Sequence, residues 1–312
     1  MTIFTTQEKY HGFGKQLPEN SSLNEWLDKT GLCYDVIRKP VLYYNSEHKL
    51  ENLLNKDVLI RNDNHRPLSI VSKNYKVVQP REVLFFFEDL INELNFKMES
   101  VGIINNGKKI FALAKTPMNF KLANDDVVNC CLLLATSYDT SMSTVVMLTS
   151  VRVACINALN IALKDNKFDR INISHLKEFK PHEVKLELGL IEKTWDNFKE
   201  NCEKLVDTKM TENERNEFYR KLLNVSDDET EENNKKKQVI SLLNDIYYNF
   251  DGQNTVTTKD TAFGVLNSVT AYVDHFRGNK RYKSFNNSRT NKALFSQGNN
   301  LKNKAFKMLV NV

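Results

Sequence analysis

The sequence predicts an α+β fold, with an antiparallel β-meander and packed helices in the N-terminal half and a mainly α-helical C-terminal half. Three observations predict it. Asn105-Asn106-Gly107 separates two apolar segments, and an Asn-Gly pair tolerates the positive φ of a tight hairpin turn. Residues 127–138 are mostly apolar over a length typical of a buried strand. After about Ser174, apolar positions recur at helical spacing over long segments.

The first 44 residues favour short elements with clear end signals. Residues 1–20 form an extended lead-in, and Ser22-Leu-Asn-Glu25 is a capping box that opens a short helix. Gly31 is suited to ending that helix, because glycine adopts the left-handed backbone of a helix C-terminus without strain. Residues 34–44 alternate β-branched and aromatic side chains. Pro40 among them predicts an edge strand, since proline donates no hydrogen bond to a neighbouring strand.

The following segments lead into the meander. Short strands are expected at residues 58–61 and 68–72, on either side of an Asn-Asp-Asn-His turn. Pro80 favours the first turn of a helix that is expected to continue through Leu94. The meander is expected to use residues 97–104, 109–115, 127–138 and 143–148.

Helices are expected in the rest of the chain. Val151, Cys155, Leu159 and Leu163 share one helical face, which predicts a helix over residues 151–163. Further helices are expected at residues 175–207, 212–223, 236–250, 258–276 and 301–309. The charge-rich, apolar-free residues 226–237 favour a loop or mobile linker. The chain is therefore divided into an α+β core domain, a helical segment and a basic C-terminal helical region, at residues 1–173, 174–255 and 256–312.

Composition excludes several classes of protein. The 312 residues are 41% hydrophobic and 27% charged, which is enough apolar content to bury a sizeable core. No segment has the roughly 18 uncharged apolar residues of a membrane span, and mean hydropathy is -0.48. The N-terminus lacks the basic and apolar regions of a secretory signal, so the cytoplasm is the expected location. The five cysteines are odd in number and include no CxxC pair, which favours reduced thiols over disulfides or zinc.

The sequence contains no motif that predicts catalysis. It has no GxGxxG, GxxxxGK[ST], GxSxG or HExxH pattern, and its six histidines are scattered. No catalytic residue, metal ligand or cofactor is therefore expected. Asp274-His275 resembles an orienting acid beside a base, but neighbouring residues do not share a helix face. A nuclease or other enzyme is thus the least favoured class.

Charge is distributed unevenly along the chain. The net charge is +5, yet residues 271–312 hold nine basic residues and one acid, Asp274. This asymmetry indicates a polyanionic partner, and interleaved aromatic side chains suit the unstacked bases of a single strand. The alternative is a basic terminal helix whose aromatic residues belong to the core. The nine basic residues are Arg277, Lys280, Arg281, Lys283, Arg289, Lys292, Lys302, Lys304 and Lys307.

Several strings resemble the phage/plasmid-like protein family, a domain of unknown function (932). The most specific are the RVACxN segment, with Arg152, Cys155 and Asn157, and the VDHxRG segment that contains Asp274 and Arg277. Tyr10 stands where the family usually has tryptophan. The resemblance covers nearly the whole chain through the strings YHGFGKQL, SKNYKVVQPREVLFFFEDL, VGIINNGKKIFALAKTP, LATSYDTSMSTVVMLTSVRVACINALNIAL, TAFGVLNSVTAYVDHFRG and ALFSQGNNLKNKAFKML.

By fold analogy, the order of elements resembles the core of phage single-strand annealing proteins. The resemblance implies a phage or plasmid protein of the bacterial cytoplasm that binds single-stranded DNA, as a homo-oligomeric ring or filament, and promotes annealing and recombination. The alternative is an accessory module that binds a host protein, such as a host complex or defence system. The expected nucleic-acid-binding residues are Lys108, Lys109, Arg152, Arg277, Lys280, Arg281, Tyr282, Lys283, Phe285, Arg289 and Lys292.

Each expected contact has an alternative. Lys108 and Lys109 either meet phosphates at a hairpin edge or lie in a solvated turn. Arg152, expected at a helix start where its charge opposes the helix dipole, meets either a carboxylate such as Asp139 or a phosphate. Asn157 either contacts a base edge or makes a buried structural hydrogen bond.

Overall fold

The chain forms two packed units in this computed structural model. Unit 1 contains Met1–Pro117, Cys131–Met147 and Arg170–Gly189, and unit 2 contains Met118–Cys130, Leu148–Asp169 and Leu190–Val312. The expected division into three domains stays a prediction. The structure describes residues 2–5, 15–18, 20–122, 126–152, 157–160, 170–188, 191–226, 228–250, 253, 255–277 and 297–311.

The largest sheet contains the expected meander. Among the described residues it has eight strands in the order β10-β9-β8-β7-β6-β1-β2, and β11 also pairs with β9. Strands β6 to β9 are consecutive in both sequence and sheet, and the α+β fold class is confirmed. The strands are β1 (Thr2–Thr5), β2 (Lys15–Gln16), β6 (Lys97–Ile104), β7 (Lys109–Leu122), β8 (Asp126–Ser137), β9 (Thr144–Arg152), β10 (Asn157–Asn160) and β11 (Arg170–Ile173).

The turn between β6 and β7 has the positive φ values that the sequence predicts, but residues 105–108 form a four-residue loop and not a two-residue type I′ turn. Asn105, Asn106 and Gly107 have φ values of 51°, 59° and 97°. Asparagine and glycine tolerate this left-handed region, so these residue types place the β6–β7 hairpin where the sequence predicts it. The register pairs Ile104 with Lys109 directly across the turn.

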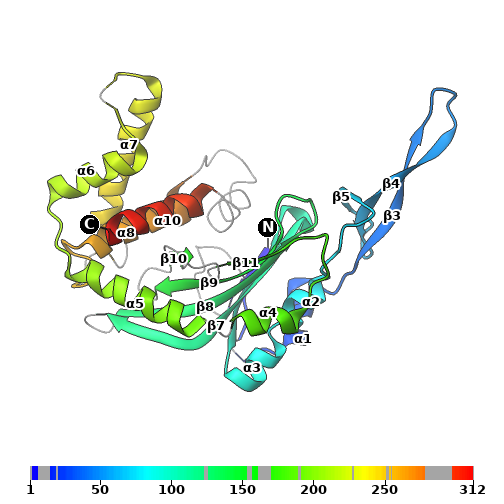
Figure 1. The fold of residues 1–312 in the computed structure, drawn as a ribbon, viewed down its shortest axis with the longest axis horizontal. Coiled ribbons are helices and arrows are strands. Elements are labelled where there is room, and N and C mark those ends of the chain that lie inside the picture. Colours follow the sequence, from blue (N-terminus) through cyan, green and yellow to red (C-terminus); the bar gives the residue numbers. More distant parts are fainter. Residues whose placement is uncertain are drawn as a thin grey trace. The chain divides into compact units, whose positions relative to one another are not determined.

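A smaller sheet in unit 1 consists of β3 (Val36–Tyr44), β4 (Leu50–Arg61) and β5 (Pro67–Ser72), in that order. Strand β3 is an edge strand, as Pro40 predicts, and the register shifts between Pro40 and Leu42. Strand β4 begins earlier than expected. Figure 1 shows that the β3–β4 hairpin extends past β5.

Short helices complete unit 1. Ser22 caps α1 (Leu23–Thr30) through a capping box, and Gly31 ends it in the left-handed conformation, as predicted. The single helix expected after Pro80 is instead two helices, α2 (Pro80–Phe85) and α3 (Glu88–Leu94). The break falls at two phenylalanines, Phe86 and Phe87, which are both buried. Helix α4 (Pro181–Leu188) begins at a proline, six residues later than the helix predicted from residue 175.

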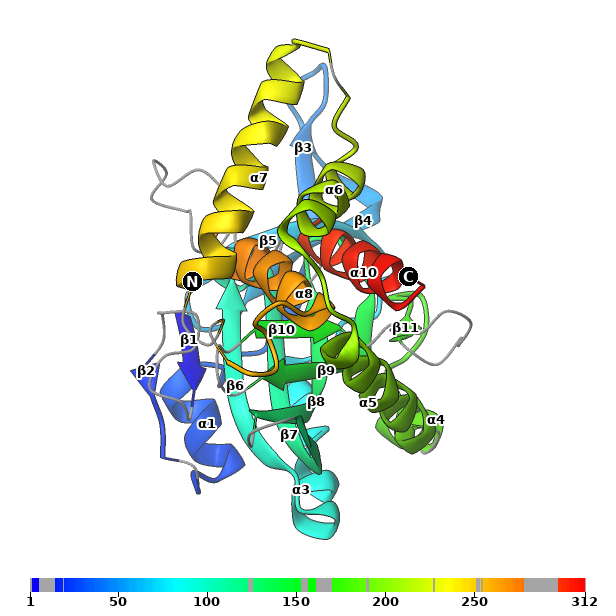
Figure 2. The ribbon, with the colours of Figure 1, turned by 90° about the vertical axis from the view of Figure 1, so that its left-hand side faces the viewer.

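Helices dominate unit 2, as predicted for the C-terminal half. Helices α8 and α10 lie side by side and contact β10 (Figure 2). Phe120 and the helical residues Trp195, Phe198 and Phe306 form an aromatic cluster, with ring centroids 5.0 to 6.1 Å apart. The helices are α5 (Ile191–Asp207), α6 (Glu212–Leu223), α7 (Glu231–Asn249), α8 (Ala262–Ala271), a π-helix (Tyr272–Phe276) and α10 (Gln297–Val310). No helix in the described residues is long and apolar enough to cross a membrane.

The helix expected over residues 151–163 is wrong where the structure describes that segment. Val151 and Arg152 end β9, and Asn157–Asn160 form β10, which pairs with β9. Val151, Cys155 and Leu159 are spaced four residues apart, and an even interval also fits the period of two of a strand. The spacing alone therefore did not distinguish the two structures.

The linker expected at residues 226–237 is also wrong, because α7 begins at Glu231. Thr230 caps the helix by accepting a hydrogen bond from the Asn233 backbone. Glu231 pairs with Lys235 and Glu232 with Lys236, each four residues apart. These ion pairs and the acidic first turn stabilise a helix that has little apolar surface there.

Helix α8 is buried on every side, and Gly264 permits its close approach to the preceding turn. A Cβ at Gly264 would lie 1.9 Å from the backbone oxygen of Thr258. We predict that Gly264→Ala lowers the free energy of unfolding by about 1–3 kcal/mol, because backbone must shift to accept the methyl group. Urea denaturation measures this change. Gly31→Asn is the control, since nothing lies within 4 Å there and asparagine tolerates its φ of 71°. Equal stability of Gly264→Ala and wild type would contradict the packing described.

Candidate functional site

A basic hollow lies in unit 1, between β3 and the segment that follows β5. Its volume is about 420 Å³. Three cationic side chains line it, from Arg38, Lys73 and Lys76, and they are 32%, 50% and 49% exposed. The cations are therefore accessible to a ligand from solvent. The remaining lining residues are Val36, Ile37, Tyr75, Val77 and Gln79.

Asp57 fixes two of the three cations. Its buried carboxylate on β4 accepts hydrogen bonds from Arg38 Nη1 at 3.1 Å and from Lys73 Nζ at 2.5 Å. Lys73 and, less strongly, Arg38 lower the pKa of Asp57, so the carboxylate stays charged near neutral pH. Lys76 Nζ lies 3.5 Å from Glu178. Three cations against these two carboxylates leave the hollow with a net charge of +1.

Tyr75, which lines the hollow, stacks on His175. Tyr75 and His175 lie with ring centroids 4.4 Å apart, and the Tyr75 hydroxyl donates to the Ser137 carbonyl oxygen at 2.6 Å. The ring nitrogens of His175 lie 3.0 and 3.2 Å from the carbonyl oxygens of Lys76 and Met142. Arg38 also donates to the Tyr75 carbonyl oxygen. The segment that carries Lys73 and Lys76 is thus held by hydrogen bonds to Arg38, to His175 and to the Ser137 backbone.

Tyr138 connects the hollow to the β6–β7 turn. Its hydroxyl donates to the Val78 carbonyl oxygen at 2.9 Å, and its backbone N–H donates to the Lys108 carbonyl oxygen at 2.7 Å. Burial raises the pKa of Tyr138, so the hydroxyl remains a donor. Tyr138 therefore brings together three segments that carry the family resemblance, namely those that contain Tyr75, Lys108 and Tyr138 itself.

The two lysines that follow Gly107 at the β6–β7 turn differ in exposure. Lys108 is exposed, whereas Lys109 is buried with 7% exposure. Desolvation lowers the pKa of Lys109, and Asp139 opposes that shift. The expectation that both lysines present their charges at the loop edge is therefore wrong for Lys109. Its position on β7, directly after the turn, directs the side chain inward.

Arg152 does not open a helix. It is the last residue of β9 and pairs with Asn157 of β10 in register. The helix-dipole argument for a partner therefore does not apply. The side-chain contacts of Arg152 and Asn157 lie outside the described residues, and both alternatives for each residue stay open.

Most of the expected C-terminal patch lies outside the described residues. Arg277 is half-buried and ends the π-helix, where its N–H donates to the Tyr272 carbonyl oxygen at 2.7 Å. Lys304 donates to the carbonyl oxygen of Leu222 at 2.7 Å, at the end of α6. Seven expected residues lie outside the described part of the chain: Lys280, Arg281, Tyr282, Lys283, Phe285, Arg289 and Lys292.

Asp274 forms a buried ion pair with Lys302. The Lys302 Nζ lies 2.9 Å from Asp274 Oδ1, and both side chains are 1% exposed. His275 beside it packs against Phe250, with ring centroids 5.1 Å apart. This burial gives Asp274 a structural role that joins the π-helix to α10. Within residues 271–312, the charges of Lys302 and Asp274 cancel each other. The other eight basic residues of this segment therefore carry its whole net charge of +8.

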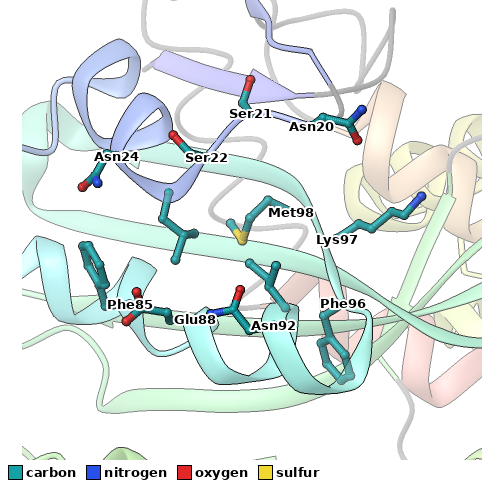
Figure 3. A pocket seen from close by; sticks show the side chains of 12 residues that line it. Asn20, Ser21, Ser22, Asn24, Phe85, Glu88, Asn92, Phe96, Lys97 and Met98 are labelled. Carbon is teal, nitrogen blue, oxygen red and sulfur yellow. The ribbon is translucent and has the colours of Figure 1, made fainter.

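A second cavity, also of about 420 Å³, lies between the start of α1 and helix α3 (Figure 3). Phe85, Phe96 and Met98 contribute apolar surface to it. Its polar rim holds one cation, Lys97, and one carboxylate, Glu88, whose charges cancel. The cationic character of the basic hollow therefore distinguishes it from this cavity. In the described residues, no group of three or more histidine, cysteine or acidic side chains is placed to hold a metal ion.

The sequence profile of the Domain of unknown function (DUF932) family matches residues 67–301. The chain belongs to this family. The DUF932 match includes Lys73, Tyr75 and Lys76, and it begins after Arg38 and Asp57. No curated protein and no solved structure matched the chain.

Sequence reasoning missed the cations of the basic hollow. The string SKNYK could have indicated the site, because its two lysines, Lys73 and Lys76, flank an aromatic residue. Arg38 gave none, because its place in the hollow depends on the pairing of β3 with β4 and on the buried carboxylate of Asp57.

Removing one partner of the Asp274–Lys302 pair is predicted to destabilise the protein. Lys302→Met would take the cation away from the buried carboxylate of Asp274, and we expect the free energy of unfolding to fall by about 3–5 kcal/mol. Urea denaturation measures it. Lys307→Met, at an exposed position of the same helix, should change stability by less than about 0.5 kcal/mol. The double variant Asp274→Asn/Lys302→Met should recover part of the loss. A fully stable Lys302→Met would show that the pair is not a structural requirement.

His175 is predicted to make stability depend on pH. Burial lowers its pKa in the folded protein, although the carbonyl contacts with Lys76 and Met142 oppose the shift. The unfolded chain therefore binds a proton first as pH falls, so the free energy of unfolding should decrease below about pH 6.5. Denaturation between pH 7.5 and 5 measures this. His175→Gln should flatten the decrease, whereas exposed His182→Gln should keep it. Equal pH profiles for wild type and His175→Gln would contradict this assignment.

Proposed function

We propose that the protein binds single-stranded DNA through the basic hollow and the basic C-terminal segment, and that it promotes annealing of complementary strands. The observation that carries the proposal is the hollow itself, where three partly exposed cations surround a cavity next to a shared carboxylate. Cations held in place by Asp57 lose little conformational freedom when a phosphate binds. The +8 charge of residues 271–312 supports the same partner.

The shape of the hollow favours a single strand over a duplex. Phosphates of a duplex lie on a stiff, convex cylinder, whereas a flexible strand can bend one phosphate into a concavity of about 420 Å³. Tyr75 lines the hollow but is buried, and its ring stacks on His175. Stacking on bases is therefore assigned to the C-terminal aromatics Tyr282 and Phe285, as the sequence indicates.

Annealing requires no bond chemistry from these residues. Neutralised phosphates reduce repulsion between two strands, and weak, repeated contacts leave base edges free to pair. Many such sites acting on one strand imply a homo-oligomer, such as a ring or filament. We further propose that this is a phage or plasmid protein acting in recombination in the cytoplasm of a bacterial host.

Removing two cations of the hollow is predicted to weaken strand binding. Lys73→Gln/Lys76→Gln should lower the affinity for a labelled single-stranded oligonucleotide about 10-fold at low salt and reduce the salt slope by about 0.7, the contribution of one neutralised phosphate. Fluorescence anisotropy at several salt concentrations measures both. Arg277→Ala/Arg281→Ala should act in the same direction on the C-terminal segment.

The matched control is Lys221→Gln/Lys235→Gln, which removes the same charge from two helix positions that are 71% and 70% exposed. It should change affinity less than twofold, and a duplex should bind wild type more weakly than the single strand. Unchanged affinity of Lys73→Gln/Lys76→Gln for the single strand would show that the strand does not bind in the hollow. Absence of salt-dependent binding by wild type, together with capture of a host protein, would replace the proposal with the host-module alternative.

A further inference from the structure

Exposed apolar residues concentrate on the smaller sheet of unit 1. The described residues include twelve large apolar side chains that are exposed, and seven of them belong to β3, β4 and β5. The fractions exposed range from 42% to 76%. The seven are Leu42, Tyr43, Tyr44, Leu50, Leu53, Leu54 and Ile70.

Six of these residues lie on the far part of the β3–β4 hairpin, residues 41–55, which we name the arm. Strand β5 pairs with β4 only over Lys56–Ile60, so no described strand covers β4 along the arm. Figure 1 shows the arm continuing beyond the end of β5. A hairpin of two strands is at best marginally stable in water, which means that the arm gains little stability from its own pairing.

One face of the arm is apolar. Tyr44 pairs with Leu50 and Leu42 with Asn52, so the side chains of these residues point to the same face. Leu53 and Leu54 follow at the register shift and are 42% and 76% exposed. The polar contacts of the arm lie on the other face, where the Tyr43 hydroxyl donates to Glu51 at 2.8 Å.

The apolar face of the arm is a large exposed patch. Leu42, Tyr44, Leu50 and Leu54 together expose on the order of 500 Å², in the upper part of the roughly 300–600 Å² range of the largest patch on a typical monomer, which is often functional. Two such faces packed together would bury about 1,000 Å² in total, which is the lower bound of a specific protein interface.

The chemistry of the arm favours a second copy over other occupants. The apolar face carries no lysine or arginine for phosphates. The tip, residues 45–49, is polar and holds the exposed Lys49–Glu47 ion pair, which is unsuited to insertion into lipid. With one lysine and two glutamates, the arm has mixed charge, so two arms would repel each other only weakly.

We propose that the arm packs against the arm of a second copy of this chain, face to face around a two-fold axis. Such an interface is isologous, because the same patch serves both partners. Leu42, Tyr44 and Leu50 would then be buried against their own counterparts. This inference names an interface for the homo-oligomer of the proposed function, and it rests on the arm alone, so it does not depend on DNA binding.

The test is the mass of the full chain in solution. Light scattering after size exclusion at micromolar concentration should give wild type twice the 36.2 kDa of one chain, or a multiple of that pair. Leu50→Ser/Leu54→Ser should raise the dimer dissociation constant at least 100-fold. Both positions are exposed in the single chain, so circular dichroism and the melting temperature should match wild type.

The control, Leu176→Ser/Leu186→Ser, removes leucines that are 67% and 66% exposed elsewhere in unit 1. It should assemble as wild type does. A monomeric wild type would overturn the proposal. An assembly whose mass and dissociation constant are the same in wild type and in the arm variant would also overturn it.

Discussion

The buried carboxylate of Asp57 is the constraint on which the candidate site depends. It lies on β4 and bonds to Arg38 of β3 and to Lys73, which follows β5. A buried carboxylate without partners would be strongly unfavourable, so the two cations stabilise it and join all three strands of the sheet. Arg38 also donates to the carbonyl oxygens of Ser72 and Tyr75. Asp57 thus holds the lysine-bearing segment against β3 and β4, while Tyr75, His175 and Tyr138 hold the same segment through their own hydrogen bonds.

Two buried charge networks in the described part of the chain have different consequences. Asp57 leaves its cations half in solvent, where they remain available to a ligand. Asp274 and Lys302 are both enclosed, and their charges cancel within the core of unit 2. The Asp-His pair that resembled a catalytic motif is therefore part of a helix junction. The proposed binding of DNA therefore relies on the cations of the hollow, which remain partly exposed.

Local signals predicted much of the fold, but they did not predict the candidate site. Ser22, Gly31 and Asn106 act through their own backbone or their nearest neighbours, so the sequence placed α1 and the β6–β7 turn. The period of residues 151–160 fitted both helix and strand, and pairing with β9 decided the outcome. The hollow depends on Arg38 and Asp57, which are 19 residues apart and meet only through strand pairing. Contacts of that kind leave no periodic trace in a sequence.

Photochemical crosslinking tests most directly whether a single strand occupies the basic hollow, as proposed. An oligonucleotide containing 4-thiothymidine would be irradiated with the full-length protein, and crosslinked peptides would be mapped by mass spectrometry. If a strand binds in the hollow, crosslinks are expected in the segment from Lys73 to Gln79, and they should be lost on addition of excess unlabelled single strand or high salt. Crosslinks confined to other segments, or none at protein concentrations that saturate binding, would contradict it.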